Sequence, residues 1–190
     1  MPDPVSALNR AAIQASHTIR IVDRGPVGQV TLRGDLTSTS LKAAVKAGVG
    51  VDVPGPLGAA FGEGGEAVWM SPDELLLLTN YRNAEALVAS LDRALSGEHH
   101  LALNVSDARA VLTLTGANVA EVLAKGAPVD LSPDAFPPGT TRRTHVAGIA
   151  VAFWRKSELE WEIVCFRSFS RHLYDWLGQS SLEGREVGVF

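Results

Sequence analysis

The sequence predicts an α+β fold built from two ferredoxin-like modules of the split βαβ type. Two observations lead to this prediction: the order of the expected elements and a short repeat. From Val27 onward the hydrophobic patterns read strand–helix–strand–strand–helix–strand, and a similar series with one extra strand follows. We therefore expect a single intertwined α+β domain over residues 27–190, whose halves, about 27–106 and 107–190, are related by a pseudo-twofold axis. Residues 1–26 are expected to form an N-terminal helix and the first strand.

The repeat joins residues 48–53, GVGVDV, to residues 126–131, GAPVDL, at an offset of 78 (126 − 48). Under this offset Leu41 falls on Val119, and a second apolar pair follows four residues later, so both predicted helices keep an apolar face. The pattern indicates an internal duplication of a strand–helix unit, in which neither half buries its sheet alone. A chance similarity between two small amphipathic segments is the alternative.

Residues 100–133 carry the clearest local patterns. Apolar residues alternate with polar or small ones over 101–106 and again over 110–115, which predicts two strands separated by a short break. From Asn118 the apolar period becomes that of a helix. Gly126 is expected to end this helix, because glycine adopts a left-handed conformation without a Cβ clash.

The remaining elements follow from the same kinds of pattern. A short terminal helix is expected over residues 1–16. The Gly-rich and Pro-rich loop over residues 54–65 either closes over a ligand or partner or is a mobile surface excursion. The run of four leucines at 75–78 is apolar on both faces, which predicts a central strand. Further strands are expected at about 19–21, 27–33, 67–70, 141–145, 149–155, 160–166 and 186–190, and further helices at 37–47, with Thr37 or Ser38 as N-cap, 83–95 and 169–177.

Composition and charge exclude several classes of partner. Hydrophobic residues make up 46% and charged residues 20% of the 190 positions, which is typical of a globular chain with a core. A net charge of −4, without a long basic run, argues against nucleic acid as a partner. The sequence has no apolar stretch of membrane-spanning length and no apolar signal segment, so we expect a cytoplasmic protein with no membrane contact. The single cysteine, Cys165, is expected to be a buried thiol in a reducing compartment.

Candidate catalytic groups are few in this sequence. His99 and His100 are adjacent and would point to opposite faces of a strand, so we interpret them as a solvated loop pair. The sequence contains no CxxC, HxxxH or HExxH spacing that would hold a metal. Ser168, Ser170 and His172 lie near one another, but without a nucleophile-elbow motif a catalytic triad is disfavoured.

Surface residues give better candidates, and these point to partner binding. Trp161 and Trp176 are candidate anchors at a partner interface, because tryptophan is enriched at such surfaces. The other two tryptophans lie in predicted strands and are expected in the core. Arg142 and Arg143 could meet an anion, although a polar interface is the favoured interpretation. Residues 73–74, Asp-Glu, could form an acid pair, but turn chemistry already accounts for the aspartate.

Four segments carry a resemblance to a known family. They are residues 69–77, WMSPDELLL, 104–109, NVSDAR, 114–117, LTGA, and 166–173, FRSFSRHL. Together they resemble the gamma-subunit family of heterotetrameric sarcosine oxidases, over about residues 32–177, which is most of the chain. Some of these elements also occur in the wider folate-dependent aminomethyltransferase-like group, to which this family is structurally related.

The resemblance implies a role as one subunit of a larger enzyme. A family member belongs to an alpha–beta–gamma–delta assembly that oxidatively demethylates sarcosine to glycine with oxygen and passes the methylene group to tetrahydrofolate. The other subunits would hold FAD, FMN, NAD and zinc, and the gamma subunit would pack mainly against alpha. The aminomethyltransferase relatives carry an acidic pair before the hairpin turn, where this chain has residues 64–67, GGEA. The resemblance therefore implies no catalytic, cofactor-binding or metal-binding residue in this chain. The alternative is a stand-alone folate-binding aminomethyltransferase-like or interaction module.

Overall fold

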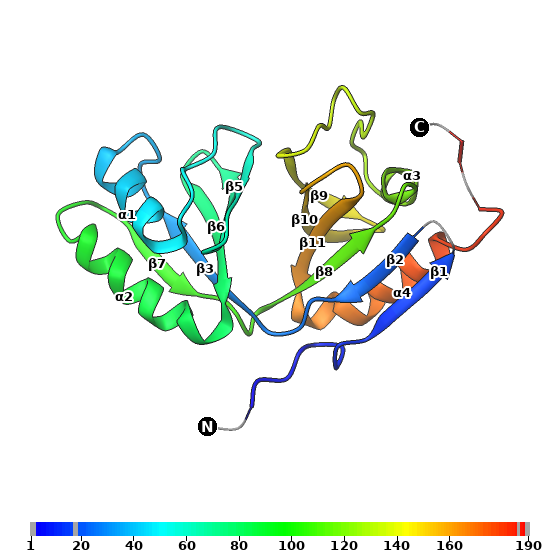
Figure 1. Ribbon diagram of the computed structural model, residues 1–190, viewed down its shortest axis with the longest axis horizontal. Coiled ribbons are helices and arrows are strands. Elements are labelled where there is room, and N and C mark those ends of the chain that lie inside the picture. Colours follow the sequence, from blue (N-terminus) through cyan, green and yellow to red (C-terminus); the bar gives the residue numbers. More distant parts are fainter. Residues whose placement is uncertain (1–2, 17–18, 186, 189–190) are drawn as a thin grey trace. The chain divides into compact units, whose positions relative to one another are not determined.

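The computed structural model describes residues 3–16, 19–185 and 187–188, and the chain divides into two compact units (Figure 1). Residues 27–106 form one of them, hereafter the continuous unit. Residues 1–26 and 107–190 together form the other, hereafter the split unit, because two separate segments of the chain build it. The chain therefore crosses from one unit to the other at residues 26–27 and returns at residues 106–107.

The continuous unit is an antiparallel sheet with two helices on one face. Its strands are β3 (Val27–Arg33), β4 (Ala59–Phe61), β5 (Glu66–Ser71), β6 (Glu74–Asn80) and β7 (Leu101–Asn104), in the spatial order β4-β5-β6-β3-β7. Its helices are α1 (Thr39–Val49), the 3-10 turn η1 (Tyr81–Asn83) and α2 (Ala84–Ala94). Both helices share one core with a single face of the sheet, and its members include Val30, Leu32, Leu41, Val45, Leu77 and Leu91.

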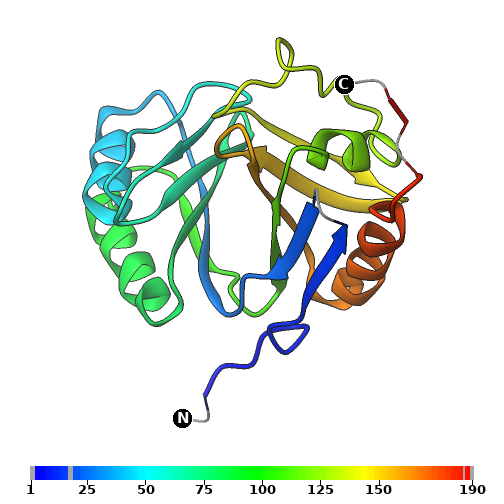
Figure 2. The same cartoon turned by 45° about the vertical axis from the view of Figure 1, so that its right-hand side comes forward.

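The split unit repeats this plan, but its sheet has six strands in place of five. Its strands are β1 (Ala12–Ser16), β2 (Ile19–Asp23), β8 (Arg109–Thr115), β9 (Thr141–Val146), β10 (Ile149–Arg155) and β11 (Glu160–Phe166), in the order β1-β2-β8-β11-β10-β9. Its helices are α3 (Val119–Ala124), the 3-10 turn η2 (Arg167–Phe169) and α4 (Ser170–Ser180). Helix α4 contacts both β1 and β2, as Figure 2 shows in orange-red beside dark blue.

An aromatic cluster anchors the Pro-rich segment before β9 to the core of the split unit. The Phe136 ring is stacked on Trp161 with 5.0 Å between ring centroids, and Phe153 completes the cluster. The Arg155 guanidinium lies over the Trp161 ring and donates a hydrogen bond of 3.0 Å to the carbonyl oxygen of Phe136. Residues 133–139 are therefore held against the sheet by both stacking and hydrogen bonding.

The two units share a topology. In each unit, one strand that lies beside the central strand belongs to the other copy of the repeated element order. In the continuous unit β7 follows α2 and pairs with the central strand β3. In the split unit the corresponding place beside β8 is filled by β2, which precedes β3 in the chain. The order strand–strand–helix–hairpin–3-10 turn–helix therefore occurs twice along the sequence, and the first strand of each copy pairs within the sheet of the other copy.

These observations confirm the predicted α+β class with antiparallel sheets of the split βαβ type. The hairpin around residues 71–74, the helix from Ser38 and the three strands after residue 140 are all present. The Ser38 side chain accepts a hydrogen bond from the backbone amide of Leu41, as an N-cap does. All four leucines at 75–78 are buried, as the continuous apolar run predicted.

The predicted N-terminal helix over residues 1–16 is wrong. Residues Ala12–Ser16 instead form β1, which pairs antiparallel with β2. The segment before it is turned by Asn9 and Arg10, whose φ angles of 52° and 58° are incompatible with a right-handed helix. Asp23 fixes that turn because its carboxylate accepts the backbone amides of Leu8 and Arg10. Local turn chemistry therefore overrides a weak amphipathic pattern.

The glycine-rich segment at 54–65 is more ordered than either interpretation of it required. It contains β4, which pairs antiparallel with β5. Several of its glycines permit close packing: a Cβ on Gly62 would lie 2.7 Å from Val51, and one on Gly65 would collide with the carbonyl oxygen of Leu78. The glycines let this strand and its flanks approach the end of α1 and the sheet edge.

Two smaller predictions also need correction. Gly126 does follow α3, but it does not adopt a left-handed conformation there. Its role is close packing, because a Cβ at this position would lie 2.7 Å from the Trp176 ring. The edge strand predicted over residues 186–190 falls mainly on positions 186, 189 and 190, which lie outside the described residues, and residues 187–188 are not in a strand.

Candidate partner-binding surface

Trp161 is not an exposed anchor, so this part of the predicted interface is wrong. Its side chain is 2% exposed and stacks on Phe136 inside the core of the split unit. The strand alternation that places Trp161 beside Ile163 on the helix-covered face explains its burial. Sequence composition alone could not distinguish a core tryptophan from an interface tryptophan.

Trp176, the second predicted anchor, is half-buried. It packs against the core of the split unit from α4, with its ring beside Gly126. Trp154 is fully buried, as the strand pattern predicted, whereas Trp69 is only half-buried at the margin of its core. Trp176 therefore combines a structural contact with a partly exposed ring.

Arg142 and Arg143 lie together at an open groove on the edge strand β9. The groove has a volume of about 400 Å³ and is lined by β9 and by the loop before it, including Pro128, Asp130 and Thr144. Arg142 is held in place, because its guanidinium lies over the Phe136 ring and donates to the carbonyl oxygen of Thr141 at 2.8 Å. The two arginines give one side of this groove a positive charge.

Most of the remaining polar candidates are engaged in structural contacts. Ser170 is buried and its hydroxyl donates to the carbonyl oxygen of Arg167 at 2.8 Å, while His172 is exposed. Glu74 is buried in an ion pair of 2.6 Å with Arg33. The pKa of the Asp73 carboxyl lies below its ordinary value because the Ser71 hydroxyl donates to it within the hairpin turn. These contacts match the interpretation of the aspartate as a turn residue.

The histidine pair lies in a loop, as expected, but one member is partly enclosed. His100 has one ring nitrogen 2.9 Å from the carbonyl oxygen of Glu98 and the other 3.1 Å from the Asp92 carboxylate. The backbone contact to Glu98, followed by the Asp92 carboxylate, raises the pKa of His100.

Burial raises the pKa of the Cys165 thiol to about 12, which makes it unreactive in the folded chain.

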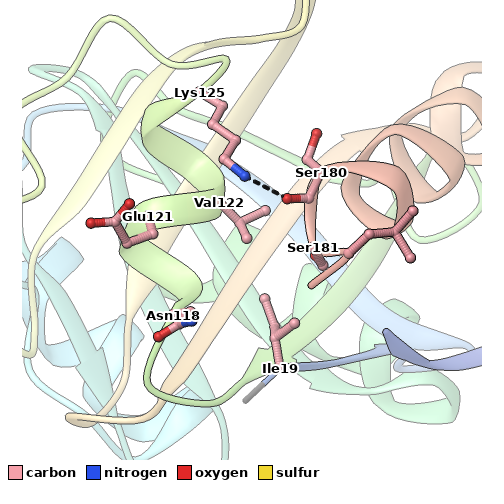
Figure 3. A pocket seen from close by; sticks show the side chains of 8 residues that line it. Ile19, Asn118, Glu121, Val122, Lys125, Ser180 and Ser181 are labelled. Carbon is pink, nitrogen blue, oxygen red and sulfur yellow. Dashed lines mark hydrogen bonds between the residues drawn. The ribbon is translucent and has the colours of Figure 1, made fainter. Parts of the chain in front are cut away.

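A second hollow, between α3 and the end of α4, is closed by the chain itself. Figure 3 shows Lys125 reaching across it to the carbonyl oxygen of Ser180, at 2.7 Å. Glu121 on the same helix accepts the backbone amides of residues 187 and 188. The hollow has a volume of about 10 Å³, which is room for a single water molecule only. The hydrogen bonds of Lys125 and Glu121 hold the C-terminal segment against the split unit. No group of three metal-ligating side chains occurs among the described residues.

The most distinctive exposed residues are two phenylalanines at the start of α4. Phe166 ends β11 and is 53% exposed, and Phe169 ends the 3-10 turn η2 and is 49% exposed. Between them, Arg167 donates from its guanidinium to the carbonyl oxygen of Val5, another exposed apolar residue. The split unit therefore exposes two aromatic rings that flank Arg167 in the sequence.

The continuous unit shows what this turn looks like with asparagine in place of the two phenylalanines. At the matching positions before α2 it has Asn80 and Asn83, and the backbone angles are nearly the same: φ −62° and ψ 139° at Asn80, φ −61° and ψ 139° at Phe166. The Asn80 side chain accepts the backbone amide of Arg82, whereas Phe166 provides no such cap. The split unit thus gives up a stabilising cap at this turn and exposes an aromatic ring instead.

Sequence reasoning missed Phe166 and Phe169, although both lie in the segment FRSFSRHL that carried the family resemblance. The available signal was the alignment of the two halves at an offset of 86 (166 − 80), which places phenylalanine opposite asparagine twice. Solvent-exposed aromatic residues beside arginine are typical of protein interfaces.

Among the described residues, no helix is both long enough and apolar enough to cross a membrane.

Comparisons with known proteins agree on one family. A family model described as "Sarcosine oxidase, gamma subunit family" matches residues 33–183. The sarcosine oxidase subunit gamma of Corynebacterium sp. strain U-96 is 33% identical over 174 residues, covering 90% of this chain and 83% of that protein. The corresponding subunit of Corynebacterium sp. strain P-1 is 38% identical over 178 residues, covering 92% of this chain and 86% of that protein.

Solved structures extend this agreement to three dimensions. A chain of the heterotetrameric sarcosine oxidase from Corynebacterium sp. U-96, solved with pyrrole 2-carboxylate, has a TM-score of 0.78 and 33% identity, covering 90% of this chain and 88% of that one. Aminomethyltransferase T of the glycine cleavage system from Bartonella henselae has a TM-score of 0.61 with 18% identity, covering 85% of this chain and 46% of that one, which shows a shared fold. On this evidence the chain belongs to the sarcosine oxidase gamma subunit family.

Proposed function

We propose that this chain is the gamma subunit of a heterotetrameric sarcosine oxidase and acts by binding other subunits. The observation that carries the proposal is the family match over residues 33–183, joined to a relative in a solved heterotetramer that aligns over 90% of this chain. The surface supports it, because the split unit exposes Phe166 and Phe169 at the two turn positions where the continuous unit has asparagine.

The assembly we propose contains alpha, beta and delta subunits, with alpha as the main contact of this chain. As a whole it would oxidatively demethylate sarcosine to glycine in the cytoplasm, using oxygen, and pass the methylene group to tetrahydrofolate. In this proposal FAD, FMN, NAD and zinc belong to the other subunits. The side chains that could act as acids, bases or nucleophiles here, such as Ser170, Glu74 and His100, are engaged in contacts that stabilise the fold.

We also propose which residues touch the partner. Phe166 and Phe169 would insert their rings into an apolar surface of the partner. Arg167, which already donates to the carbonyl oxygen of Val5, and Arg171, which is paired with Asp175 at 2.8 Å, would lie at the polar rim of that contact. Arg142, Arg143 and Trp176 would form a second, more polar contact on the same unit. Aromatic anchors at the centre of an interface contribute most of its binding energy, so the phenylalanines are expected to dominate.

A stand-alone folate-binding function is the second candidate, and the shared fold with aminomethyltransferase T is the observation that favours it. The region that would carry the acidic pair weighs against it. Gly64 and Gly65 lie there against the end of α1, and Gly65 has no space for a side chain beside the carbonyl oxygen of Leu78. We therefore expect no acidic side chain to be tolerated at Gly65.

Reconstitution with the other three subunits tests the proposal. The wild-type chain should join them in equal amounts, and Phe166→Ser with Phe169→Ser should weaken incorporation by about a hundredfold, since two truncated anchors lose roughly 1.4 kcal/mol or more each. Leu159→Ser is the matched control, because Leu159 is equally exposed but lies in the β10–β11 hairpin turn. Failure of the wild-type chain to join any subunit would contradict the proposal.

Calorimetry with tetrahydrofolate separates the two candidate functions. The isolated chain should show no binding at micromolar concentrations if it acts only as a subunit. Micromolar binding by the isolated chain would favour the stand-alone folate-binding module instead.

A further inference from the structure

Strand β7 is an edge strand of its sheet, and one of its faces is strongly apolar. Among the described residues it pairs with β3 alone. Leu101 and Leu103 project from it and are 49% and 52% exposed. A short edge strand that exposes large apolar side chains is usually covered or protected by charge, because its free backbone groups can pair with another chain.

The backbone register shows which groups of β7 are free to pair. The amide of Val105 donates to the carbonyl oxygen of Gln29 at 2.8 Å, so residues 101, 103 and 105 direct their backbone groups toward β3. Ala102 and Asn104 therefore direct theirs toward the open edge. The helix-covered face of the strand is fixed, since Ala102 packs on the core and the Asn104 amide donates to Glu85 of α2 at 2.7 Å.

The split unit shows how the same edge is covered elsewhere in this molecule. Its strand β2 holds the topological place of β7, and the two pairings match: Val22 lies opposite Thr113, as Leu103 lies opposite Thr31. The strand ends match too, because Asp23 accepts the backbone amide two residues later at 3.1 Å and Asn104 does so at 3.0 Å. In the split unit the outer edge of this strand is covered by the antiparallel strand β1.

We propose that an extended segment of a partner subunit adds to β7 as a sixth strand, in the place that β1 takes on β2. Its backbone would pair with Ala102 and Asn104, and its apolar side chains would cover Leu101 and Leu103. Recognition of this kind draws affinity from main-chain hydrogen bonds and specificity from alternate side chains. The inference rests on the proposed function, which supplies the partner subunits, and it adds a docking site on the continuous unit.

Amide hydrogen exchange in the reconstituted complex tests this inference directly. In the free chain the amides of Ala102 and Asn104 should exchange quickly, and assembly should slow them at least tenfold. Leu103→Lys should weaken incorporation about tenfold, because it places a charge in the apolar contact. Leu182→Lys, which changes an exposed leucine of the split unit, should alter incorporation less than twofold.

Three results would overturn the inference, and they are distinguishable. If the complex forms but both amides still exchange quickly and Leu103→Lys assembles normally, β7 is not the docking strand, while the proposed function stands. If the free chain forms a homodimer that Leu103→Lys dissolves, a second copy of this chain covers β7 instead. If the wild-type chain recruits no subunit at all, the proposed function falls and this inference falls with it.

Discussion

In the continuous unit the residue just before the 3-10 turn η1 is Asn80, whereas the residue just before the matching turn η2 in the split unit is Phe166. The backbone is the same in both places, yet one side chain caps the turn and the other is exposed to solvent. A second contrast concerns the sheet edge, where β2 is covered by β1, whereas no described residue pairs with the outer edge of β7. The two units therefore share their internal framework and differ at their rims.

This contrast teaches where function lies in a duplicated fold. The positions that the sequence repeat aligns at an offset of 78 are buried: Leu41 and Val119, and likewise Val45 and Leu123, are all at most 1% exposed. Core positions conserve volume and pattern because packing constrains them in both units. Exposed positions carry no such constraint, so an aromatic ring or a bare apolar strand at the rim indicates a contact with another molecule.

The largest expected effect sharpens the comparison of the two cores. Trp161→Ala should lower the free energy of unfolding of the split unit by about 3–5 kcal/mol, because it removes the ring on which Phe136 stacks and leaves a cavity. Trp69→Ala in the continuous unit should have a smaller effect, since Trp69 is only half-buried. Chemical denaturation, monitored by amide hydrogen exchange in each unit separately, measures both changes. Equal losses would break the distinction between the two tryptophans.

A somewhat smaller loss is expected in the central strand of the split unit. Leu112→Ala should cost about 2–5 kcal/mol, because Leu112 is fully buried among the helices and the sheet. Chemical denaturation is again the measurement. A loss below about half a kilocalorie per mole would mean that this face of β8 can collapse around the smaller side chain.

Exchanging the residue at the N-cap position of each 3-10 turn should shift the free energy of unfolding by about 1 kcal/mol. Asn80→Ala removes the side chain that accepts the Arg82 amide and should destabilise the continuous unit. Phe166→Asn should instead stabilise the free split unit by a similar amount while weakening assembly. Thermal unfolding of the free chains and incorporation into the complex give the two readings. If Phe166→Asn destabilises the free chain, its ring serves the fold of this chain and not a partner.

The smallest expected effect is the pH dependence of the contact between His100 and Asp92. The pKa of His100 is raised in the folded state, so protonated His100 stabilises the fold below its unfolded pKa, and this contribution is lost as pH rises through the folded pKa. His100→Gln should therefore cost a few tenths of a kcal/mol at pH 5.5 and almost nothing at pH 8.5. Unfolding curves at both pH values check this, and an equal cost at both would show that the charge does not contribute.

Periodic patterns were sufficient to predict most of the fold. The hairpin at 71–74 and the leucine run at 75–78 each depend on short-range chemistry that a sequence displays directly. The N-terminal strand β1 was missed because its formation depends on pairing with β2 and on the turn that Asp23 fixes. Strand β4 was missed because its neighbouring glycines were interpreted as flexible, whereas they serve close packing.

The candidate site was harder to predict, for a physical reason. Interface tryptophans and core tryptophans are the same residue type, and only the alternation of β11 within the folded sheet placed Trp161 inside. Exposure of Phe166 and Phe169 likewise depends on a turn geometry that follows from tertiary structure. Arg142 and Arg143 were placed correctly on one strand, but the groove beside them is formed by a separate loop.

We propose that this chain functions by attachment to a larger sarcosine oxidase. The most direct measurement is native mass spectrometry of the chain purified from its own source at low salt. Our account predicts one copy of the chain in a complex with three different subunits, at least one of which carries flavin. A lone monomer of 20.1 kDa with no flavoprotein companion would contradict it.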